Sequence, residues 1–258
     1  MKKTQIIILA ILSILFINCE IKEEITFNKD GSGELFYTYD MSKMLKEIPD
    51  SSKAADDMDT IFDFDKMLND PKFKDSIAAL SPEKRKTLES LRMMKMKMIV
   101  NSEEKKAEMG FGFGFKDINK LEDVLKKIQT AQQAVKTKKD GNPIKESPLY
   151  DGLSGNNQNV SYSFDGKHFK KSVSLKHKIT EKDNKDMDNM VKSQDEISKL
   201  FDALKYTIIL NFPKKIKKVN NKNAVFSNNH KTVSISYSID EYLKNPEKLN
   251  LEIELNKH

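Results

Sequence analysis

The most constraining feature of this chain is a pair of alternating runs between residues 94 and 115. Methionines alternate with lysines in the first run, as at Met96 and Met98, and phenylalanines alternate with glycines in the second, as at Phe111 and Phe113. A period of two is that of a β-strand, so the two runs and the polar segment between them predict a hairpin. We expect the shared methionine and phenylalanine face to be buried in the core. The bare glycine face predicts either a backbone that lies close or a bend.

Two more hairpins are predicted where an Asp-Gly pair separates β-rich runs, at Asp30-Gly31 and at Asp165-Gly166. Residues 50–60 are expected to be an exposed loop, and residues 62–68 a helix. Ser81-Pro82 is typical of a helix start. Further strands are predicted at 206–212, 224–226, 232–239 and 249–255. Strands joined by hairpins and grouped apart from the helices predict an α+β fold with antiparallel sheets and packed helices.

The chain divides where its periodicity disappears. Between residues 136 and 159 neither strand nor helix spacing continues, and glycine and proline accumulate. We therefore expect an N-terminal half over residues 19–138, a loop over 139–159 and a C-terminal half over 160–258. Both halves begin with a hairpin and continue through helical segments to further strands, so they are expected to be similar, as an internal duplication would make them.

The N-terminus predicts where in the cell the protein is located. Cys19, the only cysteine, follows an apolar run at residues 6–17 and a positively charged start. This is the layout of a secretory signal, and the run is shorter than the about 20 residues that span a bilayer. Leu15-Phe16-Ile17-Asn18-Cys19 resembles a bacterial lipobox, although Asn18 stands where Gly or Ala is usual. The resemblance implies cleavage after residues 1–18 and a diacylglycerol on the Cys19 thiol. The alternative is an uncleaved apolar N-terminus with an incidental cysteine.

A lipidated Cys19 implies that the membrane is one partner of the protein. We expect a lipid-anchored protein of the cell envelope, on the outer membrane, facing the periplasm or the surface. Lys22, Glu23 and Glu24 follow closely and resemble the surface-export signal of Bacteroidetes lipoproteins. The alternative is that these three residues form a plain charged tether.

Composition excludes some classes of function. The net charge of +6 includes Lys2 and Lys3, so removal of the signal leaves +4. Such a thin and scattered excess argues against nucleic acid as a partner. With Cys19 lipidated, no thiol remains for a disulfide, and packing alone must hold the fold together.

No motif predicts catalysis, a metal or a cofactor. The Phe-Gly run lacks the strand–loop–helix context and the Lys-Ser/Thr of a phosphate loop, and the histidines lack metal-ligand spacing. No nucleophile elbow occurs. Residues 28–33 match the start of a calcium loop, but Tyr39 stands where that loop needs a glutamate. The aspartates between residues 56 and 65 form either a weak cation site or a favourable helix start. We expect no catalytic or metal-binding residues and no cofactor.

The basic run Lys214-Lys215-Ile216-Lys217-Lys218 has two interpretations. Its lysines can contact anionic lipid headgroups, or they can keep a solvated edge strand from aggregating. The sequence favours the edge strand.

The C-terminal part of the chain carries a family resemblance. Residues 206–216, with Phe212-Pro213 near their end, then Val219-Asn220 and residues 231–236 resemble the strand, Phe-Pro turn and strand of LppM-type bacterial lipoprotein domains. They are also similar to uncharacterised lipoproteins of Bacteroidetes. The resemblance implies an antiparallel α+β envelope domain and supplies no catalytic residues.

Together these observations predict a non-enzymatic lipoprotein that binds or scaffolds an unknown envelope partner, a protein or a lipid. The alternative is a carrier of a hydrophobic ligand, with its ligand face at Met96, Met98, Phe111 and Phe113. A deep apolar cavity lined by Met98, Phe111 and Phe113 would favour the carrier, and a solid core there would favour the scaffold.

Overall fold

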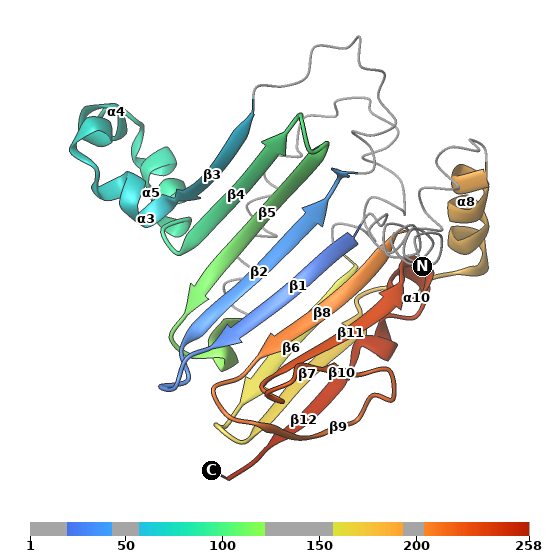
Figure 1. The fold of residues 1–258 in the computed structure, drawn as a ribbon. Coiled ribbons are helices and arrows are strands. Elements are labelled where there is room, and N and C mark those ends of the chain that lie inside the picture. Colours follow the sequence, from blue (N-terminus) through green and yellow to red (C-terminus); the bar gives the residue numbers. More distant parts are fainter. Residues whose placement is uncertain (1–19, 43–56, 122–156, 193–203, 258) are drawn as a thin grey trace, which may run out of the picture.

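The fold consists of two β-sheets with short helices around them (Figure 1). The computed structural model describes residues 20–42, 57–121, 157–192 and 204–257. The larger sheet contains β1 (Glu20–Phe27), β2 (Gly33–Asp40), β3 (Met58–Asp63), β4 (Met94–Asn101), β5 (Lys106–Phe115), β8 (Lys205–Asn211), β10 (Val225–Phe226) and β11 (Thr232–Ser238). The smaller sheet contains β6 (Gln158–Phe164), β7 (His168–Leu175), β9 (Ile216–Val219) and β12 (Leu251–Leu255). The strand orders are β10-β11-β8-β1-β2-β5-β4-β3 and β6-β7-β12-β9.

The helices are short and connect strands. They are α3 (Phe64–Asn69), α4 (Lys74–Ala78), α5 (Pro82–Ser90), α8 (Glu181–Lys192) and α10 (Ile239–Lys244), with 3-10 turns η1 (Pro71–Phe73), η2 (Ile118–Lys120) and η3 (Pro246–Leu249). As predicted, Ser81 caps α5, because its side chain accepts the backbone N–H of Lys84. Within the described ranges, no helix is both long and apolar enough to cross a membrane.

The predicted hairpins are confirmed. β1 and β2 are joined at Gly31, which has a φ of 85°, and β6 and β7 are joined at Gly166, which has a φ of 88°. Glycine adopts such left-handed backbone without a steric penalty. β4 and β5 pair in antiparallel register, with Met96 opposite Phe111.

The topology departs from the prediction in one respect. The sheets are antiparallel except that β8 pairs with β1 in parallel, with Tyr206 beside Ile21. A parallel pair needs a long crossover, and here most of the chain lies between the two strands. The β-rich, mixed architecture is compatible with an α+β fold, but the prediction of antiparallel pairing alone is wrong. Strands from both predicted halves share the larger sheet; the expected boundary at residue 138 lies outside the described residues.

A second correction concerns residues 50–68, predicted as a loop followed by a helix from residue 62. The described part of this segment contains strand β3, and helix α3 begins only at Phe64. β3 is an edge strand that pairs with β4, Phe62 opposite Met96. A long-range pairing of this kind is not visible in the local pattern of a polar segment.

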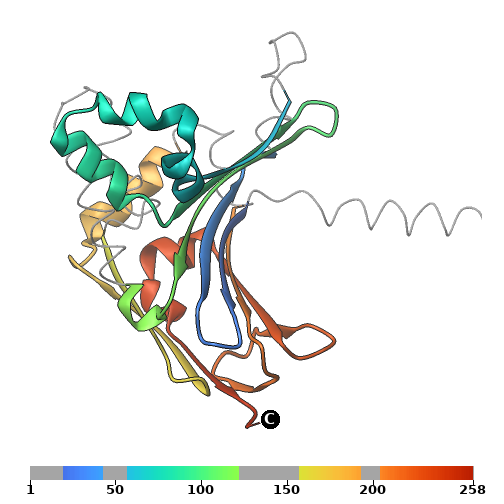
Figure 2. The same ribbon diagram turned by 90° about the vertical axis from the view of Figure 1, so that its left-hand side faces the viewer.

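The core lies between the two sheets. In Figure 2 the yellow strands of the smaller sheet lie against one face of the larger sheet, and the teal helices α3–α5 lie on the same side. Phenylalanines fill one end of the interface: the Phe27 ring stacks on Phe212 at 5.2 Å between centroids and contacts Phe164 at 4.5 Å. Phe115 and Phe169 complete this aromatic cluster. Each fully buried side chain of this size contributes roughly 1.5–3 kcal/mol.

Candidate functional site

A buried ion pair joins the two sheets. Glu23 lies on β1 and Lys171 on β7, and each side chain is 1% exposed. Lys171 Nζ lies 2.5 Å from Glu23 Oε2. Both residues occupy inward positions in an otherwise apolar alternation: Glu23 stands between Ile21 and Ile25, and Lys171 follows Phe169. The alternation of the strands therefore places the two opposite charges face to face in the core.

Tyrosine hydroxyls complete the hydrogen bonding of this pair. Tyr162 donates to Glu23 Oε1 at 2.9 Å, and Tyr206 donates to Glu23 Oε2. Tyr37 lies 3.2 Å from the Tyr162 hydroxyl. Lys171 Nζ also lies near two ring faces, 5.8 Å from the Tyr162 centroid and 5.6 Å from that of Tyr206. A buried charge is tolerated when it is paired and hydrogen-bonded in this way.

Burial shifts the titration of this group. Loss of solvent lowers the pKa of Lys171, while the charge of Glu23 opposes that change. Burial also raises the pKa of Tyr37, Tyr162 and Tyr206 well above its usual value, and the charge of Glu23 adds to the effect. Shifted values often mark active sites, but here Glu23, Lys171, Tyr162 and Tyr206 are all buried. This polar group is closed to a substrate, and its hydrogen bonds connect β1 and β8 of the larger sheet to β6 and β7 of the smaller sheet.

The second feature is an apolar surface that continues from the core onto β5, β4 and β3. We call it the methionine face and define it by the side chains that share one side of these strands in the observed register: Met58, Phe62, Met96, Met98, Met109 and Phe111. Met58, Phe62 and Met109 are 38%, 47% and 40% exposed. Exposed apolar side chains gathered in this way are typical of an interaction surface.

The four predicted core residues are buried to different degrees. Phe113 is 2% exposed and belongs to the core, which confirms the prediction for this residue. Phe111 is partly buried, with its ring 5.9 Å from Phe113 and 5.3 Å from Tyr37. Met96 and Met98 are half-buried. The expectation that all four residues are core is therefore confirmed for Phe113 alone, since Phe111 packs against the core but is partly buried and Met96 and Met98 are half-buried.

The glycine face of β5 is covered mainly by a side chain, although a Cβ on Gly110 would also come 2.9 Å from the backbone O of Tyr37. Phe36, opposite Gly112 on β2, lies over the strand: a Cβ built on Gly112 would come 2.1 Å from Phe36 Cδ2, and one on Gly110 2.6 Å from Phe36 Cε1. The third glycine, Gly114, has open space at that position. The absent side chains make room for the phenylalanine ring, which was not predicted, and the expected close backbone is found only at Gly110.

The expected export residues Lys22, Glu23 and Glu24 lie within β1. Cys19, like the signal peptide over residues 1–18, is outside the described residues. Lys22 forms an ion pair with Glu20 at 3.4 Å, and Glu24 accepts a hydrogen bond from Asn211 at 2.7 Å. With Glu23 in the buried ion pair, none of the three belongs to a free tether in the folded protein. Their role in export stays a prediction; a test of it must leave Glu23 unchanged.

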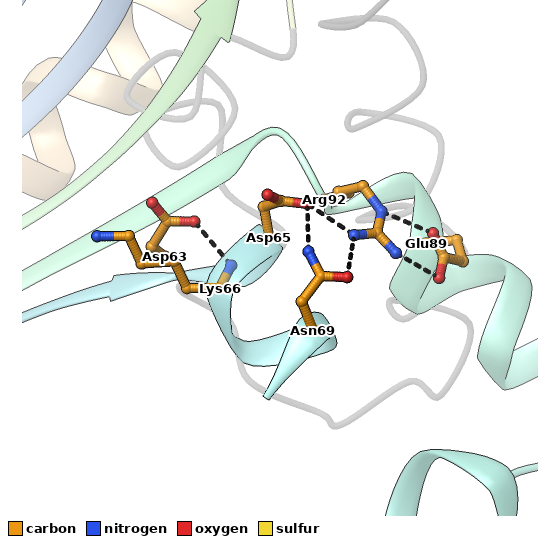
Figure 3. Close-up of polar contacts among 6 residues, drawn as sticks. All are labelled: Asp63, Asp65, Lys66, Asn69, Glu89 and Arg92. Carbon is orange, nitrogen blue, oxygen red and sulfur yellow. Dashed lines mark hydrogen bonds and ion pairs between the residues drawn. The ribbon is translucent and has the colours of Figure 1, made fainter. Parts of the chain in front are cut away.

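The acidic segment near residue 65 is used for helix packing (Figure 3). Arg92 donates to both carboxylate oxygens of Glu89 at 2.9 Å and to Asp65 at 2.6 Å, and these hydrogen bonds raise its pKa. Asn69 donates to the same Asp65 at 3.2 Å. Asp63 accepts the backbone N–H three residues further on and so caps α3. Asp63 and Asp65 thus follow the helix-start interpretation, whereas Asp59 lies in β3 and Asp57 accepts the backbone N–H of Ser102. Over the described ranges, no cluster of His, Cys, Asp and Glu could hold a metal ion.

A groove of about 620 Å³ lies on the outer face of the smaller sheet, and most of its charged side chains have a partner. Lys170 pairs with Glu252 at 3.2 Å in this groove, and His168 pairs with Asp165 at 3.0 Å. Backbone hydrogen bonds from the turn lower the pKa of Asp165. The remaining charged lining residues are Glu254, which pairs with Lys167 and Lys217, and Lys218, whose ammonium group has no partner among the described residues.

The comparisons with known proteins add little to these observations. No family model matches the chain, and a search of curated proteins gives no match. A search of solved structures finds the folded domain of LppM from Mycobacterium tuberculosis, determined by NMR, which is 9% identical. The alignment covers 92% of this chain and 89% of that one, with a TM-score of 0.36. LppM is thus a weak structural neighbour; similarity at this level supports no argument about function, and membership of an LppM-type family stays a prediction.

Proposed function

We propose that this chain is a lipid-anchored lipoprotein of the cell envelope, held at the outer membrane by Cys19, that binds an envelope protein through its methionine face. The observation that carries the proposal is the exposure of Met58, Phe62 and Met109 on one side of β3–β5. Large apolar side chains left in water are costly, and a partner with its own apolar surface would remove that cost.

The form of this face favours a protein over an enclosed ligand. It begins at Phe113 in the solid core, continues through the partly buried Phe111, and opens to solvent at Met109. A carrier would enclose its ligand, as pockets for small molecules usually do, whereas Met58, Phe62 and Met109 stay exposed although α3–α5 lie on the same side of the sheet. Methionine side chains are flexible and polarisable, so they adapt to an irregular partner.

A site-specific photocrosslinker tests this proposal. The crosslinking amino acid replaces Phe62 in one variant and Ile61 in the other, in cells that make the lipoprotein. Ile61 is a matched control because it is 62% exposed and is the next residue on the same strand, on the opposite face. We expect a protein adduct from position 62 and none from position 61, as measured by mass spectrometry of the purified product. Lipid adducts at position 62 would favour the carrier instead, and equal adducts at both positions would contradict a specific face.

We further propose that the protein works without a metal, a cofactor or catalysis. The only support is that neither the sequence motifs nor the described side chains assemble such a site. A metal that binds the native state must raise its stability by mass action. We therefore expect millimolar calcium or zinc to leave the melting temperature unchanged; a rise of several degrees would overturn the proposal.

A further inference from the structure

The direction of β1 defines two ends of the larger sheet. The lipid anchor of the proposed function would hold the end at Glu20 close to a membrane. Glu20, the residue after Cys19, opens β1, and Phe27 closes it. The strand's eight residues span roughly 26 Å at about 3.3 Å per residue. We call the end beyond Phe27 the distal end; in Figure 1 it lies at the lower edge, near the C-terminus.

Connections from both sheets are joined by hydrogen bonds at the distal end. The backbone N–H of Phe212 donates to Lys231 O at 2.9 Å, and that of Ile216 donates to His230 O at 2.7 Å. The N–H of Asn256 donates to Lys215 O at 2.9 Å. The β8–β9 connection, the β10–β11 turn and the C-terminal segment therefore form one continuous surface, and the lysines that they carry lie together.

This surface has an excess of unmatched positive charge. Exposed lysines lie along it at Lys214, Lys215, Lys218 and Lys231, and the ammonium group of none of these four makes a hydrogen bond or ion pair with the described residues. Of the nearby carboxylates, Glu254 pairs with Lys167 and Lys217 and Asp165 pairs with His168, whereas Asp30 keeps its charge and accepts hydrogen bonds from Ser32.

Apolar side chains project beside these lysines. Val225 and Phe226 form the short edge strand β10, next to the turn that carries Lys231, and they are 68% and 39% exposed. The Phe226 ring stacks on His230 at 5.6 Å between centroids. Lysines beside exposed aromatic and aliphatic residues are typical of surfaces that bind a lipid interface, since the ammonium groups meet phosphates and the apolar groups enter the headgroup layer.

We propose that the distal end binds the anionic headgroups of a second membrane, so that the protein bridges it to the membrane that holds its lipid anchor. The proposal rests on the anchor at Cys19 for its orientation. On the sequence alone, the lysines of residues 214–218 were better explained as protection of an edge strand. β9 is indeed an edge strand, but that role does not explain Lys231 or the exposed Phe226 on the other sheet.

The test uses the acylated full protein, purified from its own membrane and reconstituted into neutral phosphatidylcholine donor vesicles. Flotation of the protein together with the donor vesicles first shows whether its lipid anchor holds it in the donor membrane. Acceptor vesicles that contain phosphatidylglycerol are then added, and their capture is measured by co-flotation of a fluorescent lipid. A bilayer-proximal lysine contributes a roughly fivefold gain in binding. We therefore expect capture that falls steeply between 0.1 and 0.5 M salt and that is absent with neutral acceptors.

The decisive variants reverse four charges at a time. The distal variant changes Lys214, Lys215, Lys218 and Lys231 to Glu; the control changes Lys66, Lys72, Lys74 and Lys84, exposed on the helical segment, to Glu. We expect the distal variant to lose capture and the control to keep it. Equal loss in both variants, or no capture by the wild type, overturns the proposal. If the protein does not float with the donor vesicles, the proposed lipid anchor is contradicted and not the distal surface. Binding by the distal end is then tested by adding the same protein directly to anionic vesicles.

Discussion

At the scale of single residues, the ion pair between Glu23 and Lys171 connects the two sheets. Each charge alone would be costly in the core, and together, with the hydroxyls of Tyr162 and Tyr206, they are satisfied. Removing one partner leaves the other buried and unpaired. We expect Lys171→Met to cost about 3–5 kcal/mol of unfolding free energy, measured by denaturant melts.

The double variant Glu23→Gln/Lys171→Met separates charge from packing. It removes both charges and keeps an acceptor for a tyrosine hydroxyl, so we expect it to recover much of the lost stability. A double variant as unstable as the sum of the two single variants would show that the residues do not act as a pair.

The buried tyrosines predict a loss of stability at high pH. Their pKa values are raised in the folded state, so the stability linked to their protonation is fully present below about pH 10 and is lost as the pH rises through the folded values. The lowered pKa of Lys171 acts oppositely, adding stability as the pH rises toward its unfolded value. Several tyrosines outweigh one lysine. We expect the melting temperature to fall above pH 10, less steeply in Tyr37→Phe; a flat profile to pH 11.5 would contradict this explanation.

Among the elements, β5 offers a matched pair of glycine positions. A Cβ on Gly112 would clash with the Phe36 ring, whereas one on Gly114 would meet no atom within 4 Å. We expect Gly112→Ala to cost about 1–3 kcal/mol, as overpacking does, and Gly114→Ala to be neutral or slightly stabilising because it restricts the unfolded chain. Denaturant melts of both variants decide. If Gly112→Ala alone were harmless, the ring would not occupy the glycine face.

The elements also show how far the sequence alone predicts this fold. Asp-Gly turns and period-two runs are local, and the hairpins that they predict are present. β3 and the parallel β1–β8 pair depend on partners far along the chain, and they were not predicted, whereas β9 confirms the edge strand expected at residues 214–218. Glu23 was interpreted as part of an export signal from its acidic neighbours. Its place in the alternation of Ile21, Ile25 and Phe27 was the signal that could have revealed a buried charge. The methionine face was predicted from local pattern, but its exposure depends on where the smaller sheet ends.

For the whole molecule, the start of β1 directly after Cys19 relates the expected lipid anchor to the orientation of the fold at the membrane. β1 begins at Glu20, so an acylated cysteine would hold that end of the larger sheet close to the membrane and turn the distal lysines away from it. A chain with a long flexible tether would have no such fixed orientation. The proposed bridge therefore depends on acylation at this residue.

We expect Cys19→Ser to abolish acylation and to leave a precursor that keeps residues 1–18, because the thiol is the acceptor of the diacylglycerol and processing depends on it. Fatty-acid labelling and the intact mass of the purified protein measure both effects. A matched control inserts a short Gly-Ser spacer between Cys19 and Glu20. It should be acylated and processed normally, because the cysteine and the segment before it are unchanged, but it should hold the sheet less rigidly. A Cys19→Ser protein that matured to the wild-type mass and still partitioned with membranes would show that the address comes from another part of the chain.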